Sequence, residues 1–194
     1  MLRIRQVGVD EVGRGPLAGP VTVAALSIPK SFPMIYFRGI TDSKKLSRKK
    51  REEWSWRLHQ ARKEGKLDFH ICSISSRVID ERGIVTAIRM AVNRSIRKLQ
   101  LDSKSKIYLD GTLRAPKKFK HQQTISGGDG KNKLISAASV VAKVHRDALM
   151  RRLAIKYPKY GFDIHMGYGT LKHRRTMKKY GMTKEHRRSF VSRS

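Results

Sequence analysis

The sequence of 194 residues contains a single cysteine, Cys72. One cysteine excludes an internal disulfide framework and a zinc site built from several cysteines, and it fits a reducing compartment. No apolar run approaches the roughly 18 residues that span a bilayer, and the N-terminus lacks the long apolar core of a signal peptide. These absences predict a soluble cytoplasmic protein.

Acidic residues are also scarce, because 15 Asp and Glu stand against 44 Lys and Arg, a formal net charge of +29 at pH 7. The basic residues are dense between Lys44 and Lys66 and again between His165 and Ser194. Nucleic acid is the favoured partner, since neutralised phosphates release counterions. A generic basic surface is the alternative. An anionic membrane is disfavoured because no amphipathic helix with an aromatic apolar face is evident.

Apolar residues recur with strand and helix periods along most of the chain. Strands are expected over 5–11, 21–28, 67–74 and 107–109. Helices are expected from Ser47 to near Gly65, over 76–100 as one long helix, and over 134–153. Residues 127–130 are expected to form a loop, and the chain from Tyr157 onward a loop and two short helices. Leading strands followed by alternating strands and helices predict an α/β domain around a mixed sheet.

Four acidic residues stand apart, because most of the others lie beside Lys or Arg. Asp10 and Glu11 follow an apolar strand and precede a glycine-rich loop, Asp110 ends another strand, and Asp129 lies in a glycine loop before a helix. Neighbouring strand residues point to opposite faces of a sheet. We therefore expect a bend after Val9 to bring Asp10 and Glu11 towards one site.

Carboxylates that cluster at strand ends repel one another unless a cation neutralises them. Oxygen-only ligands suit Mg²⁺ or Mn²⁺ better than zinc. Two such ions about 4 Å apart activate a water and stabilise the leaving oxygen in phosphodiester hydrolysis. Spacing alone does not show that four distant acids converge, and the alternative is that each one caps a helix or pairs with an arginine.

Six sequence blocks, in a fixed order, resemble the motifs of one enzyme family. They are GVDEVGRGPLAGPV at 8–21, DSKKLS at 42–47, LDG at 109–111, ISAASVVAKV with RD at 135–147, YGF with the following His, Gly-Tyr and Thr at 160–170, and HRRSF at 186–190. Together they resemble the type 2 ribonuclease H family, ribonuclease HII, over essentially the whole chain. A lone Asp-Glu pair would be weak evidence, whereas six ordered blocks are specific.

The resemblance implies a ribonuclease H-like mixed sheet flanked by helices, with a small helical C-terminal extension. We expect a catalytic domain over 1–155 and a basic extension over 156–194 packed on it. The resemblance also implies a site that holds two Mg²⁺ or Mn²⁺ ions through four carboxylates, Asp10, Glu11, Asp110 and Asp129.

Two points concern the assignment of the family's fourth carboxylate to Asp129. Asp147 competes for that place, but its position inside a helix beside Arg146 favours a structural role. The family has a lysine where this chain has Gly127, two residues before Asp129. The substitution removes a local cation that would contact phosphate or control the pKa of the acid.

The resemblance implies that the substrate is an RNA–DNA hybrid or a DNA duplex with embedded ribonucleotides, cut on the 5′ side of the ribonucleotide to leave 3′-hydroxyl and 5′-phosphate ends. Glycines allow close backbone approach to a sugar, and the 2′-hydroxyl is both donor and acceptor. The resemblance assigns Gly13, Arg14, Gly15 and Tyr168 to the ribonucleotide, and the alternative for Tyr168 is an ordinary buried aromatic residue. Ser43, Lys44 and Lys45 are candidates for backbone phosphates, with solvated surface residues as the alternative. His165 is expected to be a core or loop-bracing histidine and is assigned no metal.

Two other functions are compatible with parts of the sequence. A non-catalytic basic binder of the ribosomal-protein type explains the charge but not Asp10, Glu11 or the glycine loop. The second alternative function is that of a nuclease of the same fold class that acts on a different substrate, such as branched DNA. Because the first motif begins at residue 8, no room is expected for the N-terminal substrate-binding domain of ribonuclease HIII. The C-terminal residues 190–194 show no evident sliding-clamp motif, and the short length suggests a monomer.

Overall fold

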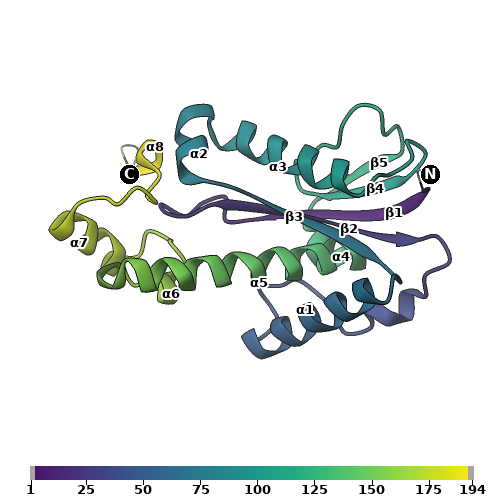
Figure 1. Cartoon of the computed structure of the whole chain (residues 1–194), viewed down its shortest axis with the longest axis horizontal. Coiled ribbons are helices and arrows are strands. Elements are labelled where there is room, and N and C mark those ends of the chain that lie inside the picture. The colour runs from purple at the N-terminus through teal and green to yellow at the C-terminus, as the bar shows by residue number, and fades with distance from the viewer. Residues whose placement is uncertain (1–2, 192–194) are drawn as a thin grey trace.

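The computed structural model describes residues 3–191. Residues 1–2 and 192–194, to which parts of the N-terminal and C-terminal expectations refer, lie outside the described range. A five-stranded sheet runs through the molecule between two layers of helices (Figure 1). Within residues 3–191 no helix is both long and apolar enough to cross a bilayer.

The sheet is mixed, with strand order β3-β2-β1-β4-β5. The first three strands in the chain are antiparallel neighbours: β1 (Arg5–Val12), β2 (Val21–Pro29) and β3 (Asp68–Ile74). The other two, β4 (Lys106–Asp110) and β5 (Gln122–Ile125), continue the sheet in parallel with β1. The expected mixed sheet is confirmed. Strand β5 was not expected, because its sequence is mostly polar and has no alternating apolar pattern.

Helices cover both faces of the sheet, and Figure 1 shows α2 (Ser76–Arg82) and α3 (Ile84–Lys98) on one side with α1 (Arg48–Lys63) and α5 (Lys133–Lys156) on the other. Side chains along β1 and β2 point alternately to the two faces of the sheet, so the hydrophobic core consists of two clusters. Val7 and Val9 pack towards α3 in one cluster, and Leu26 packs towards α1 and α5 in the other. Helix α5 crosses β1 so closely at Gly8 that an added Cβ would lie 2.1 Å from the carbonyl carbon of Leu134.

Two expectations about local structure are wrong. The expected long helix over 76–100 is broken at Gly83, whose φ of 76° and ψ of 155° separate α2 from α3. The apolar period continues across the break, so periodicity could not reveal it. The expected loop at 127–130 is instead a helical turn, α4 (Gly128–Lys131), which begins after Gly127 in the left-handed region at φ 62°.

The C-terminal part contains more helices than the two expected. After η2 (Pro158–Tyr160) come α6 (Phe162–His165), α7 (Leu171–Tyr180) and α8 (Arg188–Val191). One further short helix, η1 (Met34–Phe37), follows β2. Helices α6 and α7 lie at the end of α5, whereas α8 lies beside α2 (Figure 1). Near the end of α5, Tyr160 and Phe162 pack on Met150 and Ala18. The division into 1–155 and 156–194 stays a prediction.

Candidate active site

Three acidic side chains converge where β1 and β4 end. One carboxylate oxygen each from Asp10, Glu11 and Asp110 lies within 4.8 Å of the other two. The parallel pairing of β1 with β4 stops at Val9 and Leu109, so Asp10 and Glu11 on β1 and Asp110 on β4 follow directly after the last paired residues. All three side chains therefore reach the same space at the carboxyl ends of these two strands.

The bend expected after Val9 is not what brings Asp10 and Glu11 together. The ladder between β1 and β2 keeps its register without interruption as far as Val12 and Thr22. Asp10 faces α5, where Ser139 contacts it, and the longer Glu11 side chain starts from the opposite face. Their meeting depends on the early end of the β4 pairing rather than on an irregularity in β1.

The site concentrates negative charge in a poorly solvated place. Asp10 is only 4% exposed, and its burial, with the charges of Glu11 and Asp110, raises its pKa well above the ordinary value. Burial and the charge of Asp110 also raise the pKa of Glu11, and Arg14, 3.5 Å away, partly offsets this. Like charges held together in low dielectric destabilise the fold, so their clustering points to a function.

The donor set fits a divalent cation. All three converging groups are carboxylates, which suit Mg²⁺ or Mn²⁺ rather than zinc. Glu11 Oε2 is buried and has no hydrogen-bond partner among the described residues. A buried carboxylate oxygen without a partner is costly, and a cation at this place would remove that cost.

Asp129 lines the same cavity but lies outside the group of three acids. Burial, followed by the charges of Asp42 and Asp110, raises the pKa of Asp129, and Lys44 acts in the opposite direction. The Lys44 Nζ is 3.9 Å from Asp129 Oδ2, so a cation is present although Gly127 replaces the family lysine.

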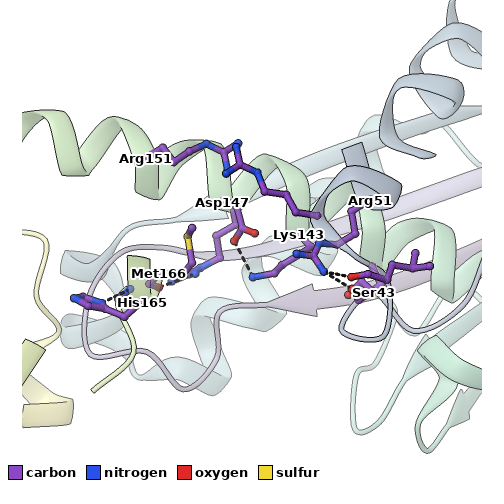
Figure 2. A network of polar contacts seen from close by, with 12 residues as sticks. Ser43, Arg51, Lys143, Asp147, Arg151, His165 and Met166 are labelled. Atoms are coloured by element: carbon purple, nitrogen blue, oxygen red, sulfur yellow. Dashed lines mark hydrogen bonds and ion pairs between the residues drawn. The ribbon is translucent and has the colours of Figure 1, made fainter. Parts of the chain in front are cut away.

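Asp147, the competitor for the fourth place, belongs to a different set of contacts. It lies on α5 and accepts a hydrogen bond of 2.8 Å from Lys143 Nζ, as Figure 2 shows. Lys143 lines the cavity, whereas Asp147 is not among the lining residues. Its carboxylate therefore orients a lysine at the cavity wall.

The cavity has a volume of about 490 Å³ and joins the acids to the glycine loop. Its walls include the residues expected to contact the ribonucleotide: Gly13, Arg14, Gly15 and Tyr168. Tyr168 is 47% exposed, so it is not an ordinary buried aromatic residue. The structure thus brings together parts of the chain more than 150 residues apart in sequence.

The three candidate phosphate ligands have different environments. Ser43 is buried, its hydroxyl oxygen lies 2.9 Å from Ser139 Oγ, and its carbonyl accepts a 2.9 Å hydrogen bond from Arg51 Nη1 (Figure 2). Lys44 lines the cavity and faces Asp129, while Lys45 is exposed and is not a lining residue. The three residues therefore do not form one equivalent set.

Sequence reasoning missed two cations at the cavity, Arg51 and Lys143. Arg51 belongs to a basic run in which no residue stands out, and Lys143 is signalled only by its i,i+4 spacing from Asp147. His165 braces the chain as expected, since its Nε2 lies 2.7 Å from the Tyr160 carbonyl and its Nδ1 accepts from the Gly167 amide at 3.2 Å.

A mixed sheet flanked by helices, with carboxylates at the adjoining ends of two parallel strands, is the arrangement of the ribonuclease H-like fold. A solved structure of this class, from the PCNA:RNase HII complex of Archaeoglobus fulgidus, has a TM-score of 0.73 at 24% identity over 95% of this chain and 94% of that one. Bst-RNase HIII in complex with Mn²⁺ has a TM-score of 0.71 at 16% identity, over 98% and 68%.

The family model described as Ribonuclease HII matches residues 7–193. A relative with the same description, from Shouchella clausii, is 45% identical over 184 residues, 94% of this chain and 67% of that protein. The chain belongs to the ribonuclease HII family. It is therefore a ribonuclease H, a metal-dependent endoribonuclease that acts on RNA–DNA hybrids.

Proposed function

We propose that the protein hydrolyses the RNA strand of RNA–DNA hybrids and also cleaves on the 5′ side of single ribonucleotides embedded in duplex DNA. The observation that carries this proposal is the position of the carboxylates of Asp10, Glu11 and Asp110 in one cavity with the glycine loop and Tyr168. The proposed hydrolytic centre and the loop proposed to contact the sugar therefore line one cavity.

In this proposal Asp10, Glu11, Asp110 and Asp129 hold two Mg²⁺ or Mn²⁺ ions. When bound, such ions activate a water and stabilise the oxygen that leaves the phosphodiester. The unpartnered Glu11 Oε2 and the raised pKa values of Asp10 and Glu11 support a cation at the three converging acids. Asp129 is assigned to the second ion because it lines the same cavity but is not one of the three converging acids.

We assign discrimination of the ribonucleotide to Gly13, Arg14, Gly15 and Tyr168. The backbone of this loop is accessible from the cavity, and a hydroxyl that both donates and accepts can pair with peptide groups. The half-exposed ring of Tyr168 offers a flat apolar face to a sugar or base. Products with 3′-hydroxyl and 5′-phosphate ends follow if the leaving oxygen is the 3′ oxygen of the preceding nucleotide.

Positive side chains are assigned to the phosphates on either side of the cleaved bond. Lys44, Arg51 and Lys143 all line the cavity, and Lys45 lies just outside it. With a net charge of +29, duplex binding is expected to weaken steeply with salt, by roughly 0.9 log units of affinity per log unit of salt for each phosphate contacted. Ser43 holds Ser139 and Arg51 in place rather than offering a free hydroxyl.

The test is cleavage of an end-labelled DNA duplex with one ribonucleotide, in Mg²⁺, in Mn²⁺ and in chelator. An all-DNA duplex of the same sequence and an RNA–DNA hybrid are the controls. The expected result is metal-dependent cutting immediately 5′ of the ribonucleotide, cutting of the hybrid, and no cutting of the all-DNA duplex.

Each other outcome points to a different function. Cleavage of the hybrid but not of the single-ribonucleotide duplex would remove the second substrate from the proposal. Cutting of substrates without ribonucleotides, such as branched DNA, would indicate a nuclease of different specificity. Tight binding without cutting in either metal would mean that the carboxylates do not form a working centre.

A further inference from the structure

Two arginines lie fully buried beside the loop formed by residues 13–20. Arg146 on α5 and Arg187 just before α8 are both 0% exposed. Within residues 3–191, no carboxylate oxygen lies within 4.0 Å of either guanidinium group. A buried charge without an ion pair is costly unless its donors are all hydrogen-bonded. Both groups are therefore held in place by backbone carbonyls.

Arg187 directs all three of its side-chain nitrogens to the 13–20 loop. Nη2 donates to the Gly13 carbonyl at 2.7 Å, Nη1 to the Arg14 carbonyl at 2.9 Å, and Nε to the Gly19 carbonyl at 3.0 Å. Its backbone amide also donates to the Leu17 carbonyl at 2.7 Å. A residue near the C-terminus thus fixes the orientation of two consecutive peptide planes in a loop 174 residues earlier.

Arg146 holds the other end of the same loop. Its donors reach the carbonyls of Pro20 at 2.9 Å, Ala18 at 3.3 Å and Met166 at 3.0 Å, so it also ties the loop to the segment that precedes Tyr168. Gly13 has a φ of +89°, and an added Cβ there would lie 2.1 Å from Arg146 Nε. Glycine is required at this position by both the backbone angle and the adjacent guanidinium.

The Arg187 hydrogen bonds decide which way the peptide groups of the loop face. In a planar trans peptide the N–H points opposite to the C=O. When the Gly13 and Arg14 carbonyls point inward to Arg187, the amides of Arg14 and Gly15 point the other way, towards the cavity that these residues line. Neither amide donates a hydrogen bond to any residue between 3 and 191. Two fixed donors are therefore available to a substrate.

We infer that Arg187 is a positioning residue for ribonucleotide discrimination. By holding two carbonyls inward it presents the amides of Arg14 and Gly15 to the sugar and phosphate of the ribonucleotide. The inference rests on the proposed function, and it makes the C-terminal segment a part of substrate selection. Arg187 contacts no substrate itself and acts through the loop.

The test compares Arg187→Lys with Arg188→Lys. Both substitutions keep the charge and lie side by side, but Arg188 is exposed, and among the described residues its backbone amide donates to Asp80 while its side chain has no hydrogen bond or ion pair. Dissociation constants are measured in chelator for a duplex with one ribonucleotide and for the all-DNA duplex. A lysine carries its three donors on one nitrogen, so it cannot reach the three carbonyls that the planar guanidinium fork of Arg187 contacts. We expect Arg187→Lys to reduce the preference for the ribonucleotide duplex by about 10-fold or more.

Affinity for the all-DNA duplex should stay within about twofold in both variants, because the phosphate contacts do not depend on the loop. Arg188→Lys should retain the wild-type preference. A merely structural defect would weaken both duplexes together. A folded Arg187→Lys protein with the wild-type preference, or one that loses affinity for both duplexes equally, would overturn the inference.

A measurement on the wild-type protein covers the case in which Arg187→Lys does not fold. The backbone amide resonances of Arg14 and Gly15 are followed by NMR in ¹⁵N-labelled protein during titration with each duplex. They should move with the ribonucleotide duplex and far less with the all-DNA duplex. Equal or absent shifts at these amides would overturn the inference. A wild-type protein that binds both duplexes equally and cuts neither would instead overturn the proposed function, and the inference with it.

Discussion

The backbone amide of Gly128 donates a hydrogen bond of 2.7 Å to Asp110 Oδ1. This contact ties the end of β4 to the start of α4, so the orientation of one carboxylate is coupled to the placement of Asp129 one residue later. An added Cβ at Gly128 would lie 2.6 Å from Ile135 Cδ1 and 3.2 Å from Asp110 Oδ1. The glycine therefore leaves space that the carboxylate occupies.

We expect Gly128→Ala to slow cleavage of the RNA–DNA hybrid by about 10-fold or more, because small misplacements of catalytic groups are costly. Gly130→Ala is the matched control, since an added Cβ at Gly130 meets no atom within 4 Å. Initial rates in saturating Mg²⁺ measure the effect. Equal rates for the two variants would mean that the Gly128 contact does not position Asp110.

Asp10→Asn should abolish cleavage, by on the order of 10³-fold or more, without destabilising the fold. The substitution removes a buried charge that faces Glu11 and Asp110, so the melting temperature in chelator should stay equal or rise. Saturating metal should stabilise the wild type, by about 2.7 kcal/mol at 100 times the dissociation constant, and should stabilise the variant much less. Thermal melts with and without Mg²⁺ or Mn²⁺ test this, with exposed Glu53→Gln as the control.

The same experiment distinguishes a metal site from a structural acid cluster. If Asp10→Asn lowers the melting temperature in chelator by several degrees, the carboxylate contributes to folding rather than to metal binding. If metal raises the melting temperature of the variant as much as that of the wild type, the ions bind elsewhere.

Tyr168→Ala should reduce cleavage at a single ribonucleotide more than cleavage of a continuous hybrid. The ring lines the cavity beside the glycine loop, and loss of stacking on a base or sugar costs about 1–3 kcal/mol, roughly 5- to 150-fold. Tyr180→Ala is the control, because Tyr180 is similarly exposed at 45% but lies on α7 outside this cavity. The ratio of kcat/KM for the two substrates is the measurement. An unchanged ratio would exclude Tyr168 from ribonucleotide recognition.

The stability of the protein should fall on mild acidification because of buried histidines in the C-terminal part. His186 is 2% exposed, its Nε2 lies 3.0 Å from His173 Nε2, and burial together with the adjacent His173 lowers the pKa of His186 to about 4. In the unfolded chain this histidine becomes protonated near pH 6.5, whereas in the folded chain His186 stays neutral until the pH falls to about 4. The free energy of unfolding therefore decreases as the pH falls through this window.

Melting temperatures at pH 7.5 and pH 4.5 measure this effect. His186→Gln should reduce the difference between the two temperatures by about 5–10 °C, which corresponds to about 2.5 kcal/mol in a chain of this length. His121→Gln, at an exposed position on the approach to β5, should leave the difference unchanged. A wild-type pH dependence in His186→Gln would show that other groups control the acid sensitivity.

The sequence by itself determined the elements with strong local signals. Strand β1 and helix α1 lie where alternation and the Ser47 cap predict them, because these patterns report which face of an element is buried. The ordered motifs also determined the family, and the match of the ribonuclease HII family model to residues 7–193 confirms it. Two elements were missed or misjudged: β5 is mostly polar and has no apolar alternation, and the break at Gly83 was hidden because apolar residues continue on both sides of that glycine.

Only the tertiary structure decided how the site is assembled. Asp10 and Asp110 are 100 residues apart, and they meet because β1 and β4 are parallel neighbours whose pairing ends just before both carboxylates. Arg187 looks like one more cation in a basic run, yet it is fully buried and holds the loop at Gly13. Local patterns report burial and backbone preference, whereas contacts between distant segments depend on strand order and on which peptide groups need partners once water is excluded. The sequence therefore indicated the chemistry of this protein, and the fold determined which residues share a cavity and which residue orients them.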